Sequence, residues 1–128
     1  MPHVLVVDDD PVVADLVAFR LQRLGLQVTV ETDGESGLAA ARRLRPDLVV
    51  LDWLMPRMDG LEVCRALRAD ADPALARTPV LLLTAKSQDP DLERGFAAGA
   101  TDFIAKPFST RELISRVTAA LPPGSVSA

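Results

Sequence analysis

Four short apolar runs along this chain each end on a polar side chain that can take part in chemistry. They are Val4–Val7 before Asp8 and Asp9, Leu48–Leu51 before Asp52, Val80–Leu83 before Thr84, and Phe103–Ala105 before Lys106. Continuous apolar runs of this length are typical of strands buried on both faces of a parallel sheet. Ligands of such sheets bind beyond the carboxyl ends of the strands. The pattern therefore predicts three carboxylates, a hydroxyl and an ammonium group together at one edge.

Between the predicted strands, apolar residues recur with the spacing of helices. After the first strand, Asp10 and Pro11 supply an N-cap and a first-turn proline for a helix. A weaker helix is predicted over residues 90–98, where Gly95 and the following Gly99 make the segment a marginal helix former.

Other signals complete the order of elements. Alternating apolar residues over 26–30 predict a short strand near an edge, and residues 70–73 interrupt the third helix. The S-x-x-E sequence of residues 109–112 has the form of a capping box and opens the last helix. Five strands alternating with five helices predict an α/β fold, a doubly wound five-stranded parallel sheet with helices on both faces.

The composition indicates one globular domain that does not bind nucleic acid directly. We expect a single domain over residues 1–121 of the 128, followed by a C-terminal tail or truncated linker over 122–128. The net charge of −4 does not favour contact with a phosphate backbone. A single cysteine, Cys64, excludes an internal disulfide, and the first residues resemble neither a signal peptide nor a membrane span. We therefore expect a cytoplasmic protein without membrane contact.

Asp8 and Asp9 are adjacent at the end of a strand, where like charges raise each other's pKa unless a cation compensates them. A hard divalent cation that prefers oxygen ligands can do so. The alternative is that these aspartates cap the first helix, whose N-terminus favours anions. For Asp10, which directly precedes a proline, capping is the preferred interpretation.

The remaining polar strand ends favour phosphoryl chemistry. A carboxylate such as Asp52 can attack phosphorus to give an acyl phosphate, with Lys106 as a cation and Thr84 as a hydroxyl donor. The formal charges of Asp8, Asp9, Asp52 and Lys106 sum to about −2, which one divalent cation neutralises. Each residue alone could be a helix cap, a strand-end hydroxyl or a solvated lysine, but their coincidence favours a metal-assisted phosphoryl acceptor.

The ordered set of motifs resembles the receiver domain of two-component response regulators over residues 3–121. The matching segments are Val-Val-Asp-Asp at 6–9, Leu-Asp-Trp-Leu-Met-Pro at 51–56, Met-Asp-Gly at 58–60, Leu-Thr-Ala at 83–85, Gly-Ala at 99–100 and Lys-Pro-Phe at 106–108. The resemblance implies a (βα)5 flavodoxin-like fold with strand order 2-1-3-4-5. It also implies a signalling switch rather than an enzyme.

The resemblance assigns roles to the acidic residues. It implies that Asp52 is the phosphoacceptor and that Asp9, Asp52 and the backbone carbonyl of Leu54 bind Mg²⁺ or Mn²⁺ directly, with Asp8 acting through water. The phosphoryl donor would be a sensor histidine kinase or a phosphotransfer protein.

The resemblance also implies how a signal is read out. Thr84 would move to hydrogen-bond the phosphoryl group, and Phe103 would turn into the space that Thr84 leaves. A cis peptide bond between Lys106 and Pro107 would help to aim the lysine. The alternative for Phe103 is an ordinary half-buried strand aromatic.

Three residues close in sequence to Asp52 and Thr84 also have predicted roles. Leu54 and Lys86, two residues after Asp52 and Thr84, are expected to tune the lifetime of the acyl phosphate. Trp53 is expected to face solvent, either as a partner contact or as a cover over the loop.

Two competing functions remain open at this point. A haloacid-dehalogenase-type phosphatase also uses an aspartate nucleophile, magnesium and a lysine, but it needs a general acid where this chain has Leu54. A receiver-like interaction module that is never phosphorylated would not need the complete acidic and lysine set.

The output partner is suggested only by a partial pattern. Asp102, Glu112 and Arg116 resemble receivers of winged-helix transcription factors, which dimerise through their fourth helix, fifth strand and fifth helix. Leu92 departs from that pattern because a basic residue is usual there. We expect a downstream effector domain or protein to contact this surface, which is also where a homodimer would form.

Overall fold

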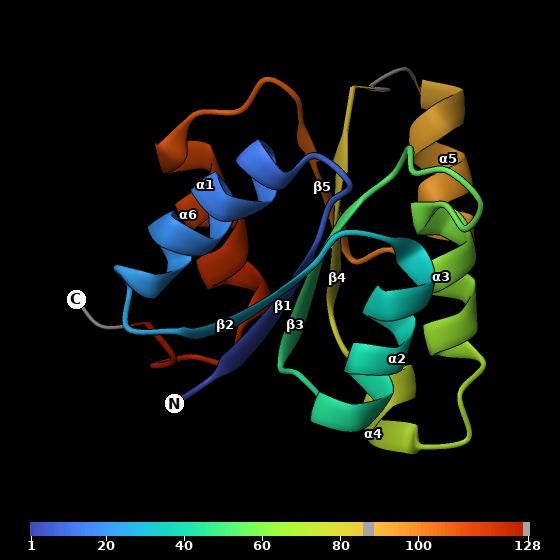
Figure 1. Cartoon of the computed structure of the whole chain (residues 1–128), viewed down its shortest axis with the longest axis horizontal. Helices are drawn as coiled ribbons and strands as arrows, with labels where there is room; N and C mark the ends of the chain where they lie inside the picture. Colours follow the sequence, from blue (N-terminus) through green and yellow to red (C-terminus); the bar gives the residue numbers. More distant parts are fainter. Residues whose placement is uncertain (86–88, 127–128) are drawn as a thin grey trace.

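The structure of the chain, a computed structural model, describes residues 1–85 and 89–126. One parallel sheet has the strand order β2-β1-β3-β4-β5 (Figure 1). The strands are β1 (His3–Val7), β2 (Gln27–Glu31), β3 (Leu48–Asp52), β4 (Val80–Thr84) and β5 (Asp102–Ala105). The helices are α1 (Pro11–Gln22), α2 (Gly34–Leu44), α3 (Gly60–Arg68), α4 (Pro73–Ala76), α5 (Asp89–Ala97) and α6 (Thr110–Ala120). The predicted α/β class, doubly wound parallel sheet and strand order are confirmed.

The helices lie in two layers, with α1 and α6 on one face of the sheet and α2, α3 and α5 on the other (Figure 1). Successive strand residues therefore enter different cores. In β1, Val4 and Val6 pack toward α1 and α6, whereas Leu5 and Val7 pack toward α2 and α3. This two-sided burial explains why the strands appear in the sequence as unbroken apolar runs.

The strand register brings the polar strand ends to the same level. Val7 pairs with Leu51, next to Asp52, and Thr84 pairs with Ala105 at the end of β5. The last residues of β3 and β4 and the residues that follow β1 and β5 therefore lie at one edge of the sheet.

Local capping fixes where the helices begin. The Asp10 carboxylate accepts hydrogen bonds from the backbone at the start of α1, and Ser109 Oγ accepts one from Glu112 N, as the sequence predicts. The described residues also contain a helix that the sequence analysis did not predict, α4, capped by Asp72. The structure thus has six helices among its described residues, and the expectation of five is wrong.

Trp53 does not face solvent, so that expectation is also wrong: only 2% of its surface is exposed. Its backbone N–H donates to Leu83 O at 3.0 Å, which continues the hydrogen bonding of β3 by one residue. Adjacent residues of a strand point to opposite faces. The Trp53 ring therefore enters the α3 and α5 side of the core, while Asp52 lines a cavity at the sheet edge.

None of the helices among the described residues is long and apolar enough to cross a membrane.

Candidate functional site

A cavity of about 270 Å³ lies at the carboxyl end of the sheet. It is lined by Asp8, Asp9, Asp10, Asp52, Trp53, Leu54, Thr84, Ala85 and Lys106. The side chains that follow β1 and β5 and the last residues of β3 and β4 meet there, as the sequence predicts.

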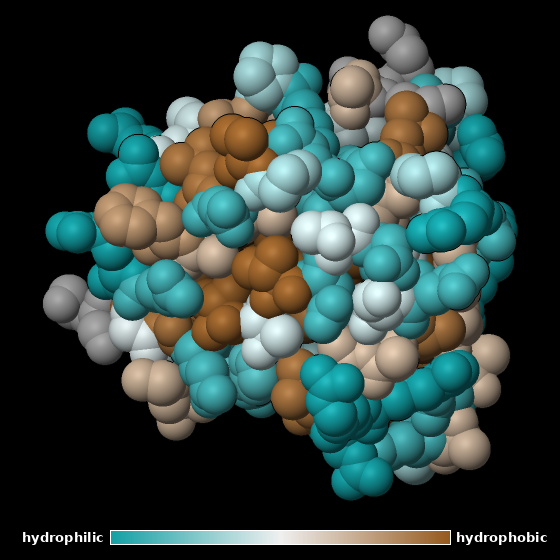
Figure 2. Space-filling view, viewed as in Figure 1, coloured by the Kyte–Doolittle hydropathy of each residue, from teal (hydrophilic) through white to brown (hydrophobic). Residues whose placement is uncertain are grey.

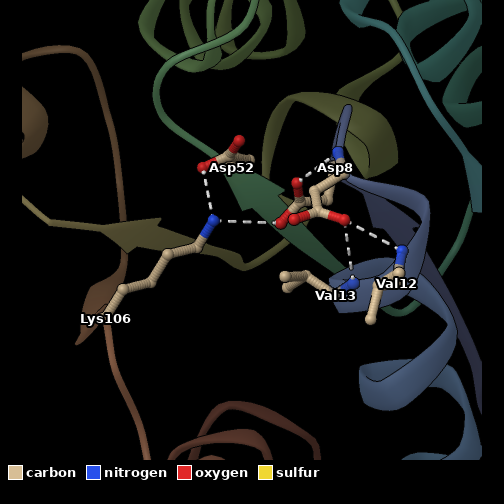
Figure 3. A network of polar contacts seen from close by, with 6 residues as sticks. Asp8, Val12, Val13, Asp52 and Lys106 are labelled. Atoms are coloured by element: carbon tan, nitrogen blue, oxygen red, sulfur yellow. Dashed lines mark hydrogen bonds and ion pairs between the residues drawn. The ribbon is translucent and has the colours of Figure 1, made fainter.

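Lys106 joins two of the carboxylates. Its Nζ donates to Asp8 Oδ2 at 3.2 Å and to Asp52 Oδ1 at 3.1 Å (Figure 3). The two aspartates are buried, whereas the lysine side chain is 26% exposed. Water is largely excluded from the carboxylates, so the ion pairs are screened less than surface pairs are.

The sequence after β1 fixes the orientation of Asp8. Its Oδ1 accepts a hydrogen bond from Asp10 N at 2.9 Å, while Asp10 itself caps α1 by accepting from Val12 N at 3.0 Å (Figure 3). Capping is therefore the role of the Asp10 carboxylate, although this residue also lines the cavity. The turn over residues 8–10 therefore both starts α1 and positions a carboxylate of the site.

Electrostatics in the cavity disfavour three simultaneous charges. Burial, followed by the negative charge of Asp8, raises the pKa of Asp52 to about 7, although Lys106 opposes this. Burial lowers the pKa of Lys106, but its hydrogen bond to Asp52 and the charges of Asp52 and Asp8 raise it overall. One ammonium group does not compensate the acidic cluster, so the site favours an additional cation.

The donor set fits a hard metal ion. Asp8, Asp9 and Asp52 each offer a carboxylate oxygen, and these three atoms lie within 4.8 Å of one another. Asp9 is exposed, which leaves one side of the cluster open to water and to ligands. Oxygen ligands together with access for water suit Mg²⁺ better than they suit softer metals.

The other predicted site residues differ in where they lie relative to the cavity. Thr84 is buried and lines the cavity, and the exposed Leu54 lines its rim. The peptide bond between Lys106 and Pro107 is cis, as the resemblance implies. Lys86 lies outside the described residues.

Phe103 packs behind the cavity instead of lining it. Only 9% of its surface is exposed, and its ring meets Phe96 edge-on at a centroid distance of 4.7 Å and Trp53 at 6.3 Å. The guanidinium of Arg94 lies 5.9 Å from the centre of the Trp53 ring. This aromatic cluster was not predicted, because Trp53 is far in the chain from Phe96 and Phe103 and no motif links the three.

Two residues of the partial dimer pattern, Asp102 and Arg116, form an ion pair within the chain. Arg116 Nη1 donates to Asp102 Oδ2 at 2.7 Å, and Leu92 is partly buried against the core. The Arg116–Asp102 pair joins α6 to β5 within one molecule.

Comparison with known proteins identifies the same family over most of the chain. The model of the response regulator receiver domain matches residues 4–118. The DNA-binding dual master transcriptional regulator RpaA of Synechocystis is 45% identical over 121 residues, which are 94% of this chain and 49% of that protein. The DNA-binding response regulator MtrA of Mycolicibacterium smegmatis is 45% identical over 119 residues, which are 93% of this chain and 50% of that protein.

Solved structures agree. The Vibrio cholerae chemotaxis protein CheY4 is similar with a TM-score of 0.89 at 34% identity, covering 94% of this chain and 99% of that one. This chain thus matches the chemotaxis protein over nearly its whole length but spans about half the length of the curated regulators.

Proposed function

The chain belongs to the response regulator receiver domain family, and on this basis we propose that Asp52 is its phosphoacceptor. The observation that supports the assignment is the position of the Asp52 carboxylate. It lies in the cavity beside Asp8 and within hydrogen-bonding distance of Lys106. The domain acts as a phosphoryl-accepting switch of a two-component system and not as an enzyme.

In the proposed reaction, a carboxylate oxygen of Asp52 forms a bond to phosphorus as the bond from phosphorus to the donor's imidazole nitrogen breaks. The electron pair of that bond leaves with the imidazole of a histidine kinase or phosphotransfer protein. Lys106 stabilises the charge on the phosphoryl oxygens, and the Thr84 hydroxyl is placed to donate to one of them. The acid form of Asp52 is a poor nucleophile, so the proton must leave first.

We assign the metal as Mg²⁺, with Mn²⁺ as a substitute. Asp9, Asp52 and the backbone carbonyl of Leu54 would hold it directly, and Asp8 would hold it through water. When bound, the ion neutralises phosphoryl charge and lowers the pKa of Asp52.

The phosphatase alternative is not supported by the position of Leu54. This residue is 57% exposed at the cavity rim and has no group that can transfer a proton to a leaving alcohol. A cytoplasmic location and a downstream effector domain, which would contact α5, β5 and α6, belong to the same proposal.

Intact mass spectrometry after incubation with acetyl phosphate and Mg²⁺ tests the assignment. We expect one added phosphate on the wild type and none on Asp52→Asn. Asp47→Asn, which removes the same charge at the opposite end of β3, is the matched control and should be labelled normally. Labelling of Asp52→Asn, or of the wild type with excess chelator, would refute the proposal.

The proposed donor protein has an apolar surface available beside the cavity. A groove of about 400 Å³ is lined by Val13, Leu16, Lys106, Pro107 and Phe108. Lys106 also lines the acidic cavity, so the groove lies next to it. Figure 2 shows hydrophobic side chains gathered over the N-terminal half of α1, where Val13 and Leu16 lie. We assign this groove to a helix of the phosphodonor, which must bring its histidine to Asp52.

Leu16→Glu separates docking from chemistry because Leu16 lies in the groove and is 45% exposed. We expect slower phosphotransfer from the donor protein but unchanged labelling by acetyl phosphate. Gln22→Glu adds the same charge at the other end of α1 and should change neither rate. Equal loss with both donors would mean that the groove is not a docking surface.

A further inference from the structure

The Phe103 ring occupies a closely fitted position between β5 and α5. Leu82 pairs with Phe103 in the sheet, and Phe96 of α5 contacts the ring edge-on. The ring is nearly buried, with only 9% of the residue's surface exposed. A phenylalanine has no hydroxyl that would favour an outward position in water, so packing alone fixes where this ring lies.

Gly95 makes this position possible. A Cβ built on Gly95 would lie 2.5 Å from Phe103 Cε1, closer still to Cζ, and 3.3 Å from Leu82 Cδ1. Real Cβ atoms do not approach a ring so closely, so any side chain at this position would displace the aromatic. Glycine lowers the stability of a helix interior by about 1 kcal/mol relative to alanine. Gly95 therefore makes α5 a less stable helix than alanine at this position would.

The same ring is close to the phosphoacceptor. Trp53 directly follows Asp52, and its ring lies 6.3 Å from that of Phe103. Leu82 is two residues before Thr84 on β4. A displacement of Phe103 would therefore disturb the packing behind both sides of the cavity.

We propose that Gly95 is a positioning residue of the switch, because its missing side chain forms the slot that holds Phe103 in its buried position. The slot sets the balance between buried and exposed positions of the ring. The affinity of the cavity for a phosphoryl group follows that balance. This inference rests on the proposed function, in which Thr84 and Phe103 respond together to phosphorylation.

The slot is tested by the effect of Gly95→Ala on stability in two backgrounds. In the wild type we expect the urea midpoint to fall, because the new methyl group collides with the ring. In Phe103→Ala, where the ring is gone, the same substitution should raise the midpoint through helix propensity. Failure of Gly95→Ala to fold, combined with stabilisation in the Phe103→Ala background, also supports the slot. A rise in both backgrounds would overturn it.

Coupling to the cavity is tested with beryllofluoride, a mimic of the aspartyl phosphate, in the presence of Mg²⁺. We expect Gly95→Ala to weaken beryllofluoride binding about fivefold or more, and to leave the affinity for Mg²⁺ alone unchanged. In the Phe103→Ala background the substitution should have no effect on beryllofluoride. Fluorescence of Trp53, the single tryptophan, reports both titrations.

The outcomes separate the two proposals. Unchanged beryllofluoride affinity in Gly95→Ala, or equal weakening of beryllofluoride and Mg²⁺, would overturn the role of Gly95 and leave the phosphoacceptor assignment intact. Absence of beryllofluoride binding to the wild type would refute the proposed function itself. The stability measurements would then still decide whether the slot exists.

Discussion

Asp52 illustrates how a functional group can destabilise the fold that carries it. In the metal-free chain its pKa is about 7, above the ordinary value of 3.8, because burial and Asp8 disfavour the charged form. The native state then binds more protons than the unfolded state between these values. Stability contributed by this group is therefore lost as pH rises from about 4 to about 7, by at most about 1.4 kcal/mol per pH unit.

Asp52→Asn removes this penalty without changing the size of the side chain. We expect the variant to be more stable than the wild type in metal-free buffer, with a gain that is larger at pH 8 than at pH 5. Urea unfolding at the two pH values measures it. Asp15→Asn, which alters an exposed acid on α1, provides the control and should show no such pH dependence. An equal gain at both pH values would contradict the raised pKa.

Leu54 is a second single residue with a measurable effect, because we expect it to control the lifetime of the proposed acyl phosphate. It lines the cavity rim, and its side chain offers no hydrogen bond to orient a water behind phosphorus. We expect a long-lived phosphorylated form in the wild type and faster hydrolysis in Leu54→Asn. Decay of the phosphorylated protein, followed by intact mass, gives the rates. If the substitution leaves the rate unchanged or slows it, Leu54 does not control access of water.

At the scale of elements, Arg68 ties the end of α3 to two other segments. Its Nε donates to Gly99 O at 2.9 Å, and its Nη1 donates to Ala76 O and Thr78 O at 3.2 and 2.6 Å. The Gly99 carbonyl follows α5, and those of Ala76 and Thr78 lie at and just beyond the C-terminal end of α4, where intrahelical partners are lacking. The guanidinium therefore satisfies acceptors at the end of the sheet opposite the cavity.

Arg68→Met keeps the aliphatic stem but removes these donors. We expect it to destabilise the chain by about 2 kcal/mol, because charged hydrogen bonds are lost and the carbonyls are left poorly solvated. Arg65→Met on the same helix is exposed and should stay within about 0.5 kcal/mol of the wild type. Urea unfolding measures both variants, and equal effects would show that the contacts contribute little.

Several elements were predictable because their signals are local. The strands follow from apolar runs, and α1 follows from an aspartate and a proline at its start. The same Asp-Pro signal opens α4 at Asp72, but a four-residue helix depends on the burial of Leu75, which the sequence does not reveal. Trp53 was misjudged because its burial depends on the backbone bond to Leu83, a residue of another strand.

The candidate site also has parts that local signals predict and parts that depend on contacts between distant elements. Its acidic residues and Lys106 end successive strands, so one topological argument brings them together. Gly95 appeared in the sequence only as a weak point of a helix. Its packing role requires the position of Phe103, which comes from a different element and has no spacing relation to it.

At the scale of the whole molecule, the sheet separates two cores that should respond differently to phosphorylation. Trp53 and Phe103 belong to the core shared by α2, α3 and α5, whereas the core under α1 and α6 contains neither. We therefore expect phosphoryl binding at the sheet edge to act on the first core through the aromatic cluster. Within that core, α5 contacts the cluster through Phe96, and α2 lies on the other side of α3 (Figure 1).

Hydrogen exchange with and without beryllofluoride and Mg²⁺ distinguishes these regions. We expect slower exchange in α5 and β5, because a new contact at Thr84 would reach these elements through Leu82 and the aromatic cluster, and unchanged exchange in α2. Asp52→Asn under the same conditions is the control and should show no difference anywhere. A uniform change in exchange across both cores would indicate global stabilisation by the ligand. No change in α5 and β5 would refute the switch mechanism but would not affect the assignment of Asp52 as the acceptor.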